Sequence, residues 1–477
     1  MSPTRSICPK VCFVIAVGLV ILLAASRVWL IPAHFSSDPN EGWNAFQAVH
    51  ALGADPLYPP AQALTGNNYP PLSFYLVGAV GLLFGDPIVG GRILALISVL
   101  VVAGGIFATA RRFAGPDAAA VGALLFLGFN VTLFRPYLCM DDPQWLAHAL
   151  MSAGLAALIP VRPDGSPTAT GVIAAALLML LGGMVKHNLV AFPAATALWL
   201  ALHHRRSLSI WIGTATAALL VAAALCYRAY GTDFFVDLLL ADRHYSVARM
   251  IVKSAPVVIA TAPLLVVSAG LVRERKSDRR VDLLLLAIAI GVPLGIIQRS
   301  GQGVDRNAHF EALIALCMAG AVALDRSRLT SGKAWLARPF PWLILPFLVL
   351  VPLAFNAEAK EIGGRALTER SWRRMEDRIA AIPGRVACEA QALCYWAGKK
   401  FEIDFFLYGQ RIARQHNSAS LQRALDEHRF GAIEMDPPKD PEGRLGEVDN
   451  PIRDILNRQF QTVFVGDDGR RLLEPAP

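Results

Sequence analysis

The chain has 477 residues, of which 54% are hydrophobic and only 17% are charged. A soluble protein of this length needs more charged surface, so the composition excludes that class and indicates a chain embedded in lipid. The formal net charge of +8 does not indicate a nucleic-acid partner, because the basic residues lie between apolar runs instead of gathering on one face with aromatic neighbours.

The first apolar run starts at Val11, after Arg5 and Lys10. This pattern fits either a cleaved signal peptide or a signal-anchor helix, and the many apolar runs that follow favour the anchor. Because a membrane span needs about 20 mostly apolar residues, the sequence predicts eleven spans. They lie approximately at residues 11–31, 88–110, 117–135, 144–160, 168–185, 188–203, 208–228, 255–272, 281–298, 308–324 and 340–356.

A twelfth apolar segment, Pro71 to Phe84, decides the topology. Its roughly fourteen residues are few for a span, so we expect an interfacial or re-entrant helix there. If this helix does not span and the N-terminus is cytoplasmic, the basic loops become cytoplasmic, as the positive-inside rule requires. These loops carry Arg111-Arg112, His203 to Arg206, Arg273 to Arg280 and Arg326 to Arg338.

The same topology places five loops and the C-terminal tail on the outer side of the membrane, which is the periplasm for a bacterial inner-membrane protein. The five loops are residues 32–87, 136–143, 186–187, 229–254 and 299–307. The tail is less apolar and alternates strand-like with helix-like runs. We therefore expect an all-α polytopic membrane domain of residues 1–356 and a small periplasmic α/β domain of residues 357–477.

Two cysteines of the tail, Cys388 and Cys394, are six residues apart in a polar segment. An oxidising compartment would allow them to form a disulfide. If both lay on one helix, however, this spacing would usually place them too far apart to pair. The sequence leaves their pairing open.

Two acidic motifs lie in the predicted outer loops. The first loop holds Asp38 and Glu41, which could act as a base and its orienting group or hold a metal ion. Asp38 precedes Pro39-Asn40, so a turn or a helix N-cap explains it equally well. The second motif, Asp141-Asp142, directly precedes an apolar run and also suits an N-cap. Because both motifs lie at one membrane surface, they could converge on one site.

Cationic residues lie on the same side. Lys186-His187-Asn188 interrupts a long apolar stretch, and a lysine at such a turn suits a phosphate group, although an interfacial turn must be polar in any case. Arg243 lies in the fourth outer loop, and Arg92 lies near the outer end of its span, where snorkelling to the interface would also explain it.

The last outer loop leads into an apolar helix through Arg306, His309 and Glu311. An acid is favoured in the first turn of a helix by the helix dipole. Ionisable residues at this depth are functional candidates by default. The alternative is a structural ion pair between Glu311 and Arg306.

Together these motifs resemble the bacterial GT-C membrane glycosyltransferases of family 39, which are related to the protein O-mannosyltransferases and the lipid A aminoarabinose transferase. The resemblance covers residues 1 to about 356, and each motif is weak by itself, but their order and common sidedness are more specific. The matching features are Asp38 to Gly42, Gly53 to Tyr58, Asn68 to Leu72, Arg135-Pro136 with Asp141 to Pro143, Lys186, and His309 to Glu311.

The resemblance implies transfer of a sugar, with inversion, from a polyprenyl-phosphate donor to a hydroxyl group of a lipid, glycan or protein acceptor, in a cavity at the outer leaflet. It implies that an acid of the first loop takes the acceptor proton, and that Asp141 or Asp142 orients the acceptor or helps Asp38 hold a divalent cation such as Mg²⁺ or Mn²⁺. The remaining implied roles are donor-phosphate binding by Lys186, Arg243 and His187, and lining of the substrate cavity by Tyr69, Arg306, His309 and Glu311.

One departure from the family leaves the base open. The family often has Asp-Glu before the glycine, whereas this chain has Asn40-Glu41 there and Asp38 two residues earlier. Position favours Glu41, and the freedom of the loop allows Asp38. The sequence does not determine whether a hexose or a pentose is transferred. Other hypotheses are a glycolipid transporter or flippase, which the number of spans would support, and a non-catalytic scaffold for the C-terminal domain.

Overall fold

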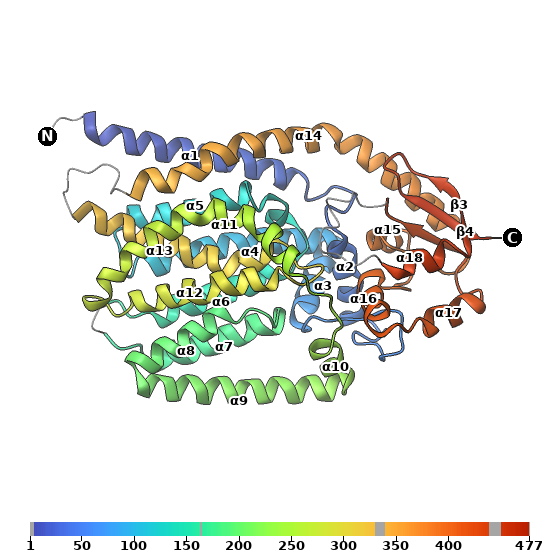
Figure 1. Cartoon of the computed structure of the whole chain (residues 1–477), viewed down its shortest axis with the longest axis horizontal. Coiled ribbons are helices and arrows are strands. Elements are labelled where there is room, and N and C mark those ends of the chain that lie inside the picture. Colours follow the sequence, from blue (N-terminus) through green and yellow to red (C-terminus); the bar gives the residue numbers. More distant parts are fainter. Residues whose placement is uncertain (1–3, 163–164, 330–338, 438–449, 477) are drawn as a thin grey trace.

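The computed structural model describes the chain except residues 1–3, 163–164, 330–338, 438–449 and 477. Figure 1 shows a bundle of helices that run along the long axis of the molecule, with a small sheet-containing domain at one end. The N-terminus lies at the opposite end of the bundle. We call the end that contacts the small domain the domain end, and the other the far end.

Helices dominate the described part of the chain. The α-helices of the bundle and its loops are α1 (Thr4–Trp29), α2 (Pro39–Leu52), α3 (Leu72–Phe84), α4 (Pro87–Ala110), α5 (Pro116–Val131), α6 (Gln144–Leu158), α7 (Ala169–Val185), α8 (Ala191–His203), α9 (Arg205–Tyr230), α10 (Asp233–Leu239), α11 (Val247–Ala269), α12 (Val281–Gln298), α13 (Phe310–Leu329) and α14 (Pro339–Ala381). Three 3-10 helices join them, η1 (Arg135–Cys139), η2 (Gly270–Lys276) and η3 (Arg306–His309).

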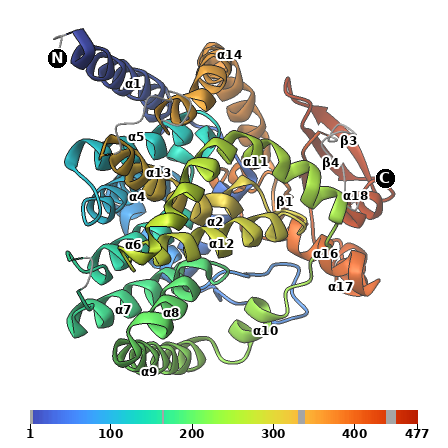
Figure 2. The ribbon, with the colours of Figure 1, turned by 60° about the vertical axis from the view of Figure 1, so that its left-hand side comes forward.

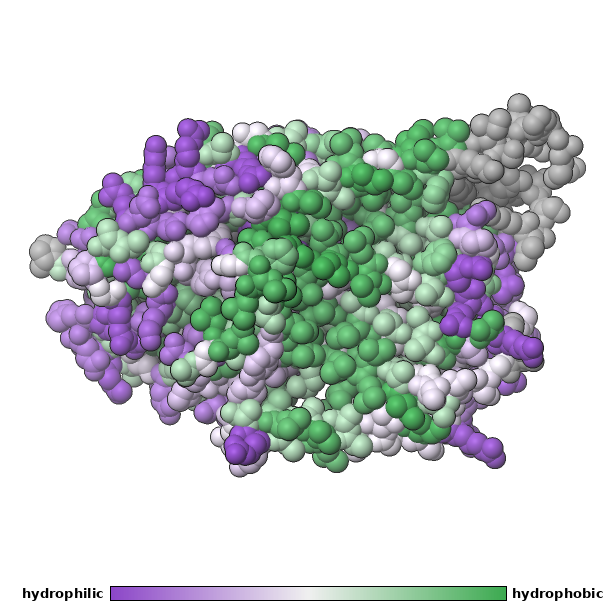
Figure 3. Space-filling view, turned by 180° about the vertical axis from the view of Figure 1, so that it is seen from behind, coloured by the Kyte–Doolittle hydropathy of each residue, from purple (hydrophilic) through white to green (hydrophobic). Residues whose placement is uncertain are grey.

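Each of the eleven predicted spans coincides with one of these helices, namely α1, α4 to α9 and α11 to α14. Among the described residues, seven helices are long and apolar enough to cross a membrane. Helices α5 to α8 are shorter, with 13 to 17 residues each. Figure 3 shows a broad apolar band across the middle of one face, between hydrophilic ends. The polytopic all-α fold is therefore confirmed, and the number of spans stays a prediction.

Helix α3, the segment that decides the topology, does not cross the bundle. Tyr69, just before α3, lies beneath Lys186 with the ammonium 4.9 Å from the centre of its ring. Asp86, just after α3, accepts a hydrogen bond of 3.0 Å from Trp396 of the small domain. Both flanks of α3 therefore lie at the domain end. The helix has only 13 residues, and the residue after it, Gly85, has a left-handed φ of 75°.

The loops divide between the two ends as the topology predicts. At the far end, Arg280 donates to the carbonyl oxygens of Arg112, Pro160 and Val161 at 2.8, 3.0 and 2.7 Å. Asp282 also contacts His203 at 2.8 Å, and Asp278 contacts Arg326 at 3.5 Å. The described parts of the four basic loops are thus neighbours, and residues 330–338 of the last loop lie outside the described residues. The predicted outer loops contact one another at the domain end, as the site below shows in detail.

The small domain contains a four-stranded sheet in the order β1-β2-β4-β3. Its elements are β1 (Val386–Cys388), α15 (Gln391–Trp396), α16 (Phe405–Gln415), α17 (Ala419–Asp426), β2 (Ala432–Met435), α18 (Pro451–Leu456), β3 (Phe460–Val465) and β4 (Arg471–Pro475). Strands β1 and β2 are parallel, and the other neighbouring pairs are antiparallel. This is the α/β domain that the sequence predicts.

The predicted domain boundary after residue 356 falls inside α14, which runs for 43 residues from the bundle into the small domain (Figures 1 and 2). Its later turns bury Trp372, Met375 and Ile379 in the core of the small domain. The two predicted domains therefore share one continuous helix.

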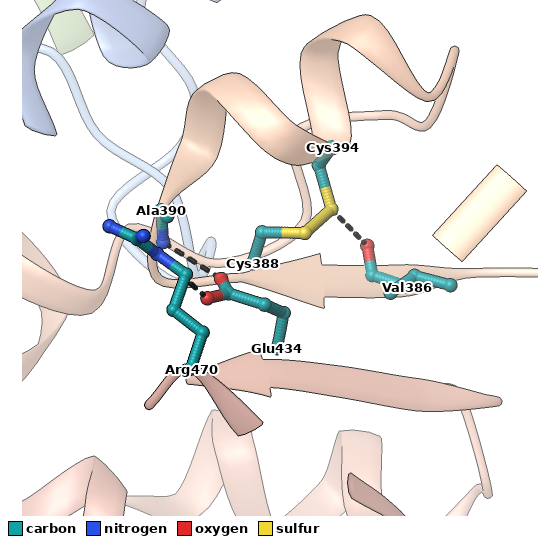
Figure 4. Close-up of a disulfide and its surroundings, with 6 residues drawn as sticks. All are labelled: Val386, Cys388, Ala390, Cys394, Glu434 and Arg470. Carbon is teal, nitrogen blue, oxygen red and sulfur yellow. Dashed lines mark hydrogen bonds and ion pairs between the residues drawn. A yellow bond between two sulfur atoms is a disulfide. The ribbon is translucent and has the colours of Figure 1, made fainter. Parts of the chain in front are cut away.

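Cys388 and Cys394 form a disulfide, with a Cα–Cα distance of 5.8 Å. Figure 4 shows the reason: Cys388 ends strand β1 and Cys394 lies on α15, which folds back over the strand. The distance that two cysteines six apart would have on one helix does not apply, so the pairing that the sequence leaves open is resolved.

Candidate functional site

Asp38 caps helix α2 and keeps one carboxylate oxygen free. Its Oδ1 accepts the Asn40 N–H at 2.9 Å, and Pro39 occupies the first helical position, so the predicted N-cap is present. No described residue bonds its Oδ2. Burial raises the pKa of Asp38 to about 7 in spite of the Asn40 hydrogen bond, and the negative charges of Asp142, Glu41 and Asp305 raise it further.

Glu41 lies one turn further along α2 and is fully buried. Arg92 of α4 binds its carboxylate in a bidentate manner, with distances of 2.8 and 2.7 Å. The backbone N–H groups of Ser37 and Asp141 donate to the same carboxylate at 2.9 and 3.2 Å. Burial alone would raise the pKa of Glu41, but the charge and hydrogen bonds of Arg92 lower it overall. Both oxygens of the Glu41 carboxylate therefore have hydrogen-bond partners within the protein.

Arg92 does not snorkel toward the membrane surface. Its guanidinium points inward and also donates to the carbonyl oxygens of Ile31, Ala33 and Phe35 at 2.9, 2.8 and 2.6 Å. These carbonyls belong to the segment that leaves α1, whose last residues have no intrahelical donors. The Arg92–Glu41 pair therefore joins the end of α1 to α2 and α4.

Asp141 and Asp142 are adjacent but point to different places. The Asp141 side chain packs against Gly91 of α4 so closely that a Cβ there would lie 2.0 Å from its Oδ1. Burial raises the pKa of Asp141 well above its ordinary value, and the charges of Glu41 and Asp142 add to this effect. Asp141 is thus directed away from Asp142, into the contact between α2 and α4.

Asp142 faces the site. Its Oδ1 accepts the N–H of Gln144 at 2.8 Å, so it contributes to the start of α6 as the sequence predicts. Its Oδ2 is buried and has no hydrogen-bond partner among the described residues. The ammonium of Lys186 lies 4.0 Å from Asp142 Oδ1. An acid and a cation from two separate predicted motifs therefore meet here.

Lys186 stands at the end of α7, in the turn before α8, and only 6% of its side chain is exposed. Burial lowers its pKa, but Asp142 and Tyr69 more than offset this, so its pKa is raised and it stays a cation. The turn is held to α12 by Asn188 and Gln298, which exchange two hydrogen bonds of 3.0 Å.

Glu311 holds the other side of this turn. Its Oε1 accepts the N–H of Phe192 at 3.1 Å, in the first turn of α8. A carboxylate suits the positive end of a helix dipole. The alternative of an ion pair with Arg306 is wrong, because Glu311 faces α8 while Arg306 donates to the Leu133 carbonyl oxygen at 3.0 Å. His309 is buried, and its Nε2 has no hydrogen-bond partner among the described residues.

Two further predicted phosphate ligands lie near Lys186. Arg243 is half-buried and has no carboxylate partner among the described residues. Burial lowers the pKa of His187 to about 4, and the positive charges of Lys186 and Arg243 contribute to the shift. His187 is therefore neutral at pH 7, and it can offer a phosphate a hydrogen bond but no charge.

The sequence reasoning missed three residues. Asp305 accepts hydrogen bonds from Tyr137 at 3.1 Å and from Arg299 at 2.8 Å. Its charge contributes to the raised pKa of Asp38, so this group borders the site. Arg299 and Asp305 lie in the last outer loop, which the sequence predicts to be beside the site. This position in the chain could have indicated them as site residues.

Near Asp38, the carboxylate oxygens without a hydrogen-bond partner among the described residues are its own Oδ2 and the Oδ2 atoms of Asp142 and Asp141. The Asp141 side chain packs against Gly91, so the first two are the candidates to bind a divalent cation. No group of three or more His, Cys, Asp or Glu suitable for a metal ion occurs among the described residues. Two carboxylates fit Mg²⁺, which often takes its remaining ligands from water and substrate phosphate. The cationic Lys186 beside Asp142 already supplies part of this neutralising charge.

Comparisons with known proteins agree with the resemblance seen in the sequence. Residues 68–229 match the family described as dolichyl-phosphate-mannose-protein mannosyltransferase. No curated protein sequence is significantly similar to the chain. The structure matches ArnT from Cupriavidus metallidurans in the apo state with a TM-score of 0.63 and 13% identity, over 98% of both chains. The same protein bound to undecaprenyl phosphate matches with a TM-score of 0.60 and 13% identity, over 97% of both chains.

Proposed function

From the GT-C fold that the chain shares with ArnT, we propose that it is a glycosyltransferase that moves a sugar from a polyprenyl-phosphate donor to an acceptor hydroxyl with inversion. The observation that supports this most is Asp38, a carboxylate with a free oxygen and a pKa of about 7, in the same site as the buried cation Lys186. A base and a phosphate ligand are the two groups that this reaction needs.

In the proposed reaction Asp38 removes the proton of the acceptor hydroxyl. The acceptor oxygen forms a bond to the anomeric carbon as the bond from that carbon to the phosphate oxygen breaks on the opposite face, which inverts the configuration. The polyprenyl phosphate leaves with the bonding electrons, and Lys186 and Arg243 stabilise its negative charge. Asp142 would orient the acceptor or hold Mg²⁺ or Mn²⁺, which would supply further neutralisation of the phosphate, and Asp38 would stay unligated as the base.

We place the site at the periplasmic face of a bacterial inner membrane, with the N-terminus in the cytoplasm. Two independent features support this orientation. The basic clusters lie at the far end of the bundle, as cytoplasmic loops do. The Cys388–Cys394 disulfide lies at the domain end and needs an oxidising compartment. Topology reporters fused at Arg112 and Arg206 test the orientation; a periplasmic signal from either would overturn it.

A transporter or flippase is the alternative function, and the position of the charges does not favour it. Transporters usually bind substrate near the bilayer midplane between two related halves. Here Asp38, Asp142 and Lys186 meet at one end of the bundle. Movement of a glycolipid across liposome membranes, without any transferred sugar, would support the alternative.

Transfer assays with reconstituted protein test the proposal. The donors are polyprenyl-phosphate hexoses and pentoses, with membrane extract as the acceptor. We expect Asp38→Asn to lower kcat by about 10²- to 10⁴-fold, the usual contribution of a general base. Asparagine is also a good N-cap, so the fold should persist. Asp86→Asn is the matched control, because Asp86 caps α4 before a proline in the same way. Equal activity of the Asp38→Asn variant and this control would overturn the role of Asp38.

A further inference from the structure

The small domain contacts the loops that form the site. Its helix α16 receives a hydrogen bond of 2.9 Å from the backbone of His244, in the loop after α10. Helix α15 packs on α2 at Gly42, where a Cβ would lie 2.1 Å from the Ala392 nitrogen. Only glycine allows this approach. The small domain therefore packs directly against the loops that form the site.

One line of buried contacts leads from this domain to the site cation. Asp404 begins α16 and accepts the indole N–H of Trp43 at 3.0 Å. The Trp43 ring packs edge-on against Tyr69, with the ring centres 5.3 Å apart. The Tyr69 ring in turn lies 4.9 Å from the Lys186 ammonium. Asp404 is 1% exposed and Trp43 is 8% exposed, so solvent offers neither group an alternative partner.

Each contact in this line fixes the next. A buried indole N–H with a single acceptor sets the rotation of the Trp43 ring, because breaking the hydrogen bond would leave the indole N–H unsatisfied, while Asp404 would keep its bond of 2.8 Å from the Leu407 N–H. The ring then limits where Tyr69 can lie. A cation is attracted to the face of an aromatic ring, so the position of Tyr69 affects that of Lys186.

We propose that Asp404 of the small domain is a positioning residue for donor binding, which acts through Trp43 and Tyr69 to place the Lys186 ammonium against the phosphate of the donor. This rests on the proposed function for the identity of the donor. It gives the small domain a part in the reaction that its sequence does not indicate.

Trp43→Phe tests this proposal, because it keeps an aromatic ring in place but removes the N–H together with the five-membered ring of the indole; the Trp396→Phe control below removes the same atoms elsewhere. We expect the KM for the polyprenyl-phosphate sugar to rise about fivefold, the effect of one hydrogen bond, with kcat changed less than about twofold. The Kd for a short-chain polyprenyl phosphate, measured by titration, should rise by the same factor. Asp404→Asn should give a similar rise, and the double variant should add little to either.

Trp396→Phe is the matched control. Trp396 also donates its indole N–H across the domain contact, to Asp86 at 3.0 Å, but it does not touch Tyr69. A merely structural role would make the two tryptophan variants alike in both stability and donor affinity. Equal donor Kd values for Trp43→Phe, Trp396→Phe and the unmodified protein would overturn the proposal. Loss of the proposed function is distinguishable, since the unmodified protein would then transfer no sugar at all.

Discussion

Two kinds of charge cluster lie at the domain end of the bundle, and they differ in how completely their charges are paired. In the closed clusters every acid meets an arginine: Glu41 pairs with Arg92, and Glu358 and Glu361 meet Arg27 and Arg135. In the open cluster of Asp38, Asp142 and Lys186, two carboxylate oxygens lack protein partners among the described residues.

This difference separates the charges that stabilise the fold, in the closed clusters, from those that remain available to bind a substrate, in the open cluster. Taking a charge out of water is costly unless a partner compensates it. The closed clusters meet this condition within the protein and join α1 to α14, η1, α2 and α4. In the open cluster Lys186 pairs with Asp142 at 4.0 Å and Asp38 has no cationic partner among the described residues, so a substrate or a cation would complete its pairing. Asp38 and Glu41 belong to different clusters although they are three residues apart.

Breaking a closed cluster should have the largest effect on stability. Glu41→Gln leaves the Arg92 guanidinium buried without its counter-charge, and we expect it to lower the free energy of unfolding by about 3–5 kcal/mol. Thermal unfolding in detergent measures this loss. The matched comparison is Asp38→Asn, which should unfold nearly as the unmodified protein does. A Glu41→Gln variant that is fully stable but inactive would show that Glu41 belongs to the open cluster.

Removing the cation of the open cluster should mainly affect the donor. Lys186→Met keeps the length and apolar stem of the side chain but removes the charge, so the donor phosphate loses a charge-assisted contact. We expect the donor KM to rise about thirtyfold, equivalent to about 2 kcal/mol, with a smaller loss of stability than Glu41→Gln causes. Titration with polyprenyl phosphate checks the affinity directly. An unchanged Kd would remove Lys186 from the phosphate site.

The smallest effect should come from the disulfide, which lies in neither kind of cluster. Replacing Cys388 and Cys394 together by serine opens a short loop of six-residue separation. We expect a loss of about 1–2 kcal/mol in stability, with kcat unchanged. Unfolding and transfer assays on the same preparation separate the two. A loss of kcat without a loss of stability would mean that the disulfide shapes the site.

The sequence predicts the framework of this comparison but not its details. Apolar periodicity predicts the helices, and the short Pro71 to Phe84 segment with the basic loops predicts which loops gather together. The separation of Asp38 from Glu41 depends on Arg92, about fifty residues away in the chain, whose side-chain direction no local pattern reveals. The divergence of Asp141 from Asp142 depends in the same way on Gly91.

Two other contacts, the disulfide and the Tyr137–Asp305 hydrogen bond, depend on how strands and loops pack and could not be predicted from the sequence. The disulfide forms because Cys388 ends a strand, and the sequence does not fix where that strand stops relative to α15. Tyr137 and Asp305 become neighbours only when the second and last outer loops meet. Long-range contacts of this kind follow from tertiary packing, which local propensity does not encode.

The pH dependence of kcat/KM tests the central claim, that Asp38 is the free base of the open cluster, most directly. Its folded-state pKa of about 7 lies above the ordinary value, so the active, ionised form appears as pH rises through that point. His187, with a pKa of about 4, and Lys186, with a raised pKa, do not titrate there. Burial raises the pKa of Asp404 to about 6, so the rise with pH is assigned to Asp38 by its loss in Asp38→Asn. We predict that kcat/KM increases with pH with a midpoint of about 7. A profile that is flat from about pH 5.5 to 8.5, as a base of ordinary carboxylate pKa would give, would contradict the claim.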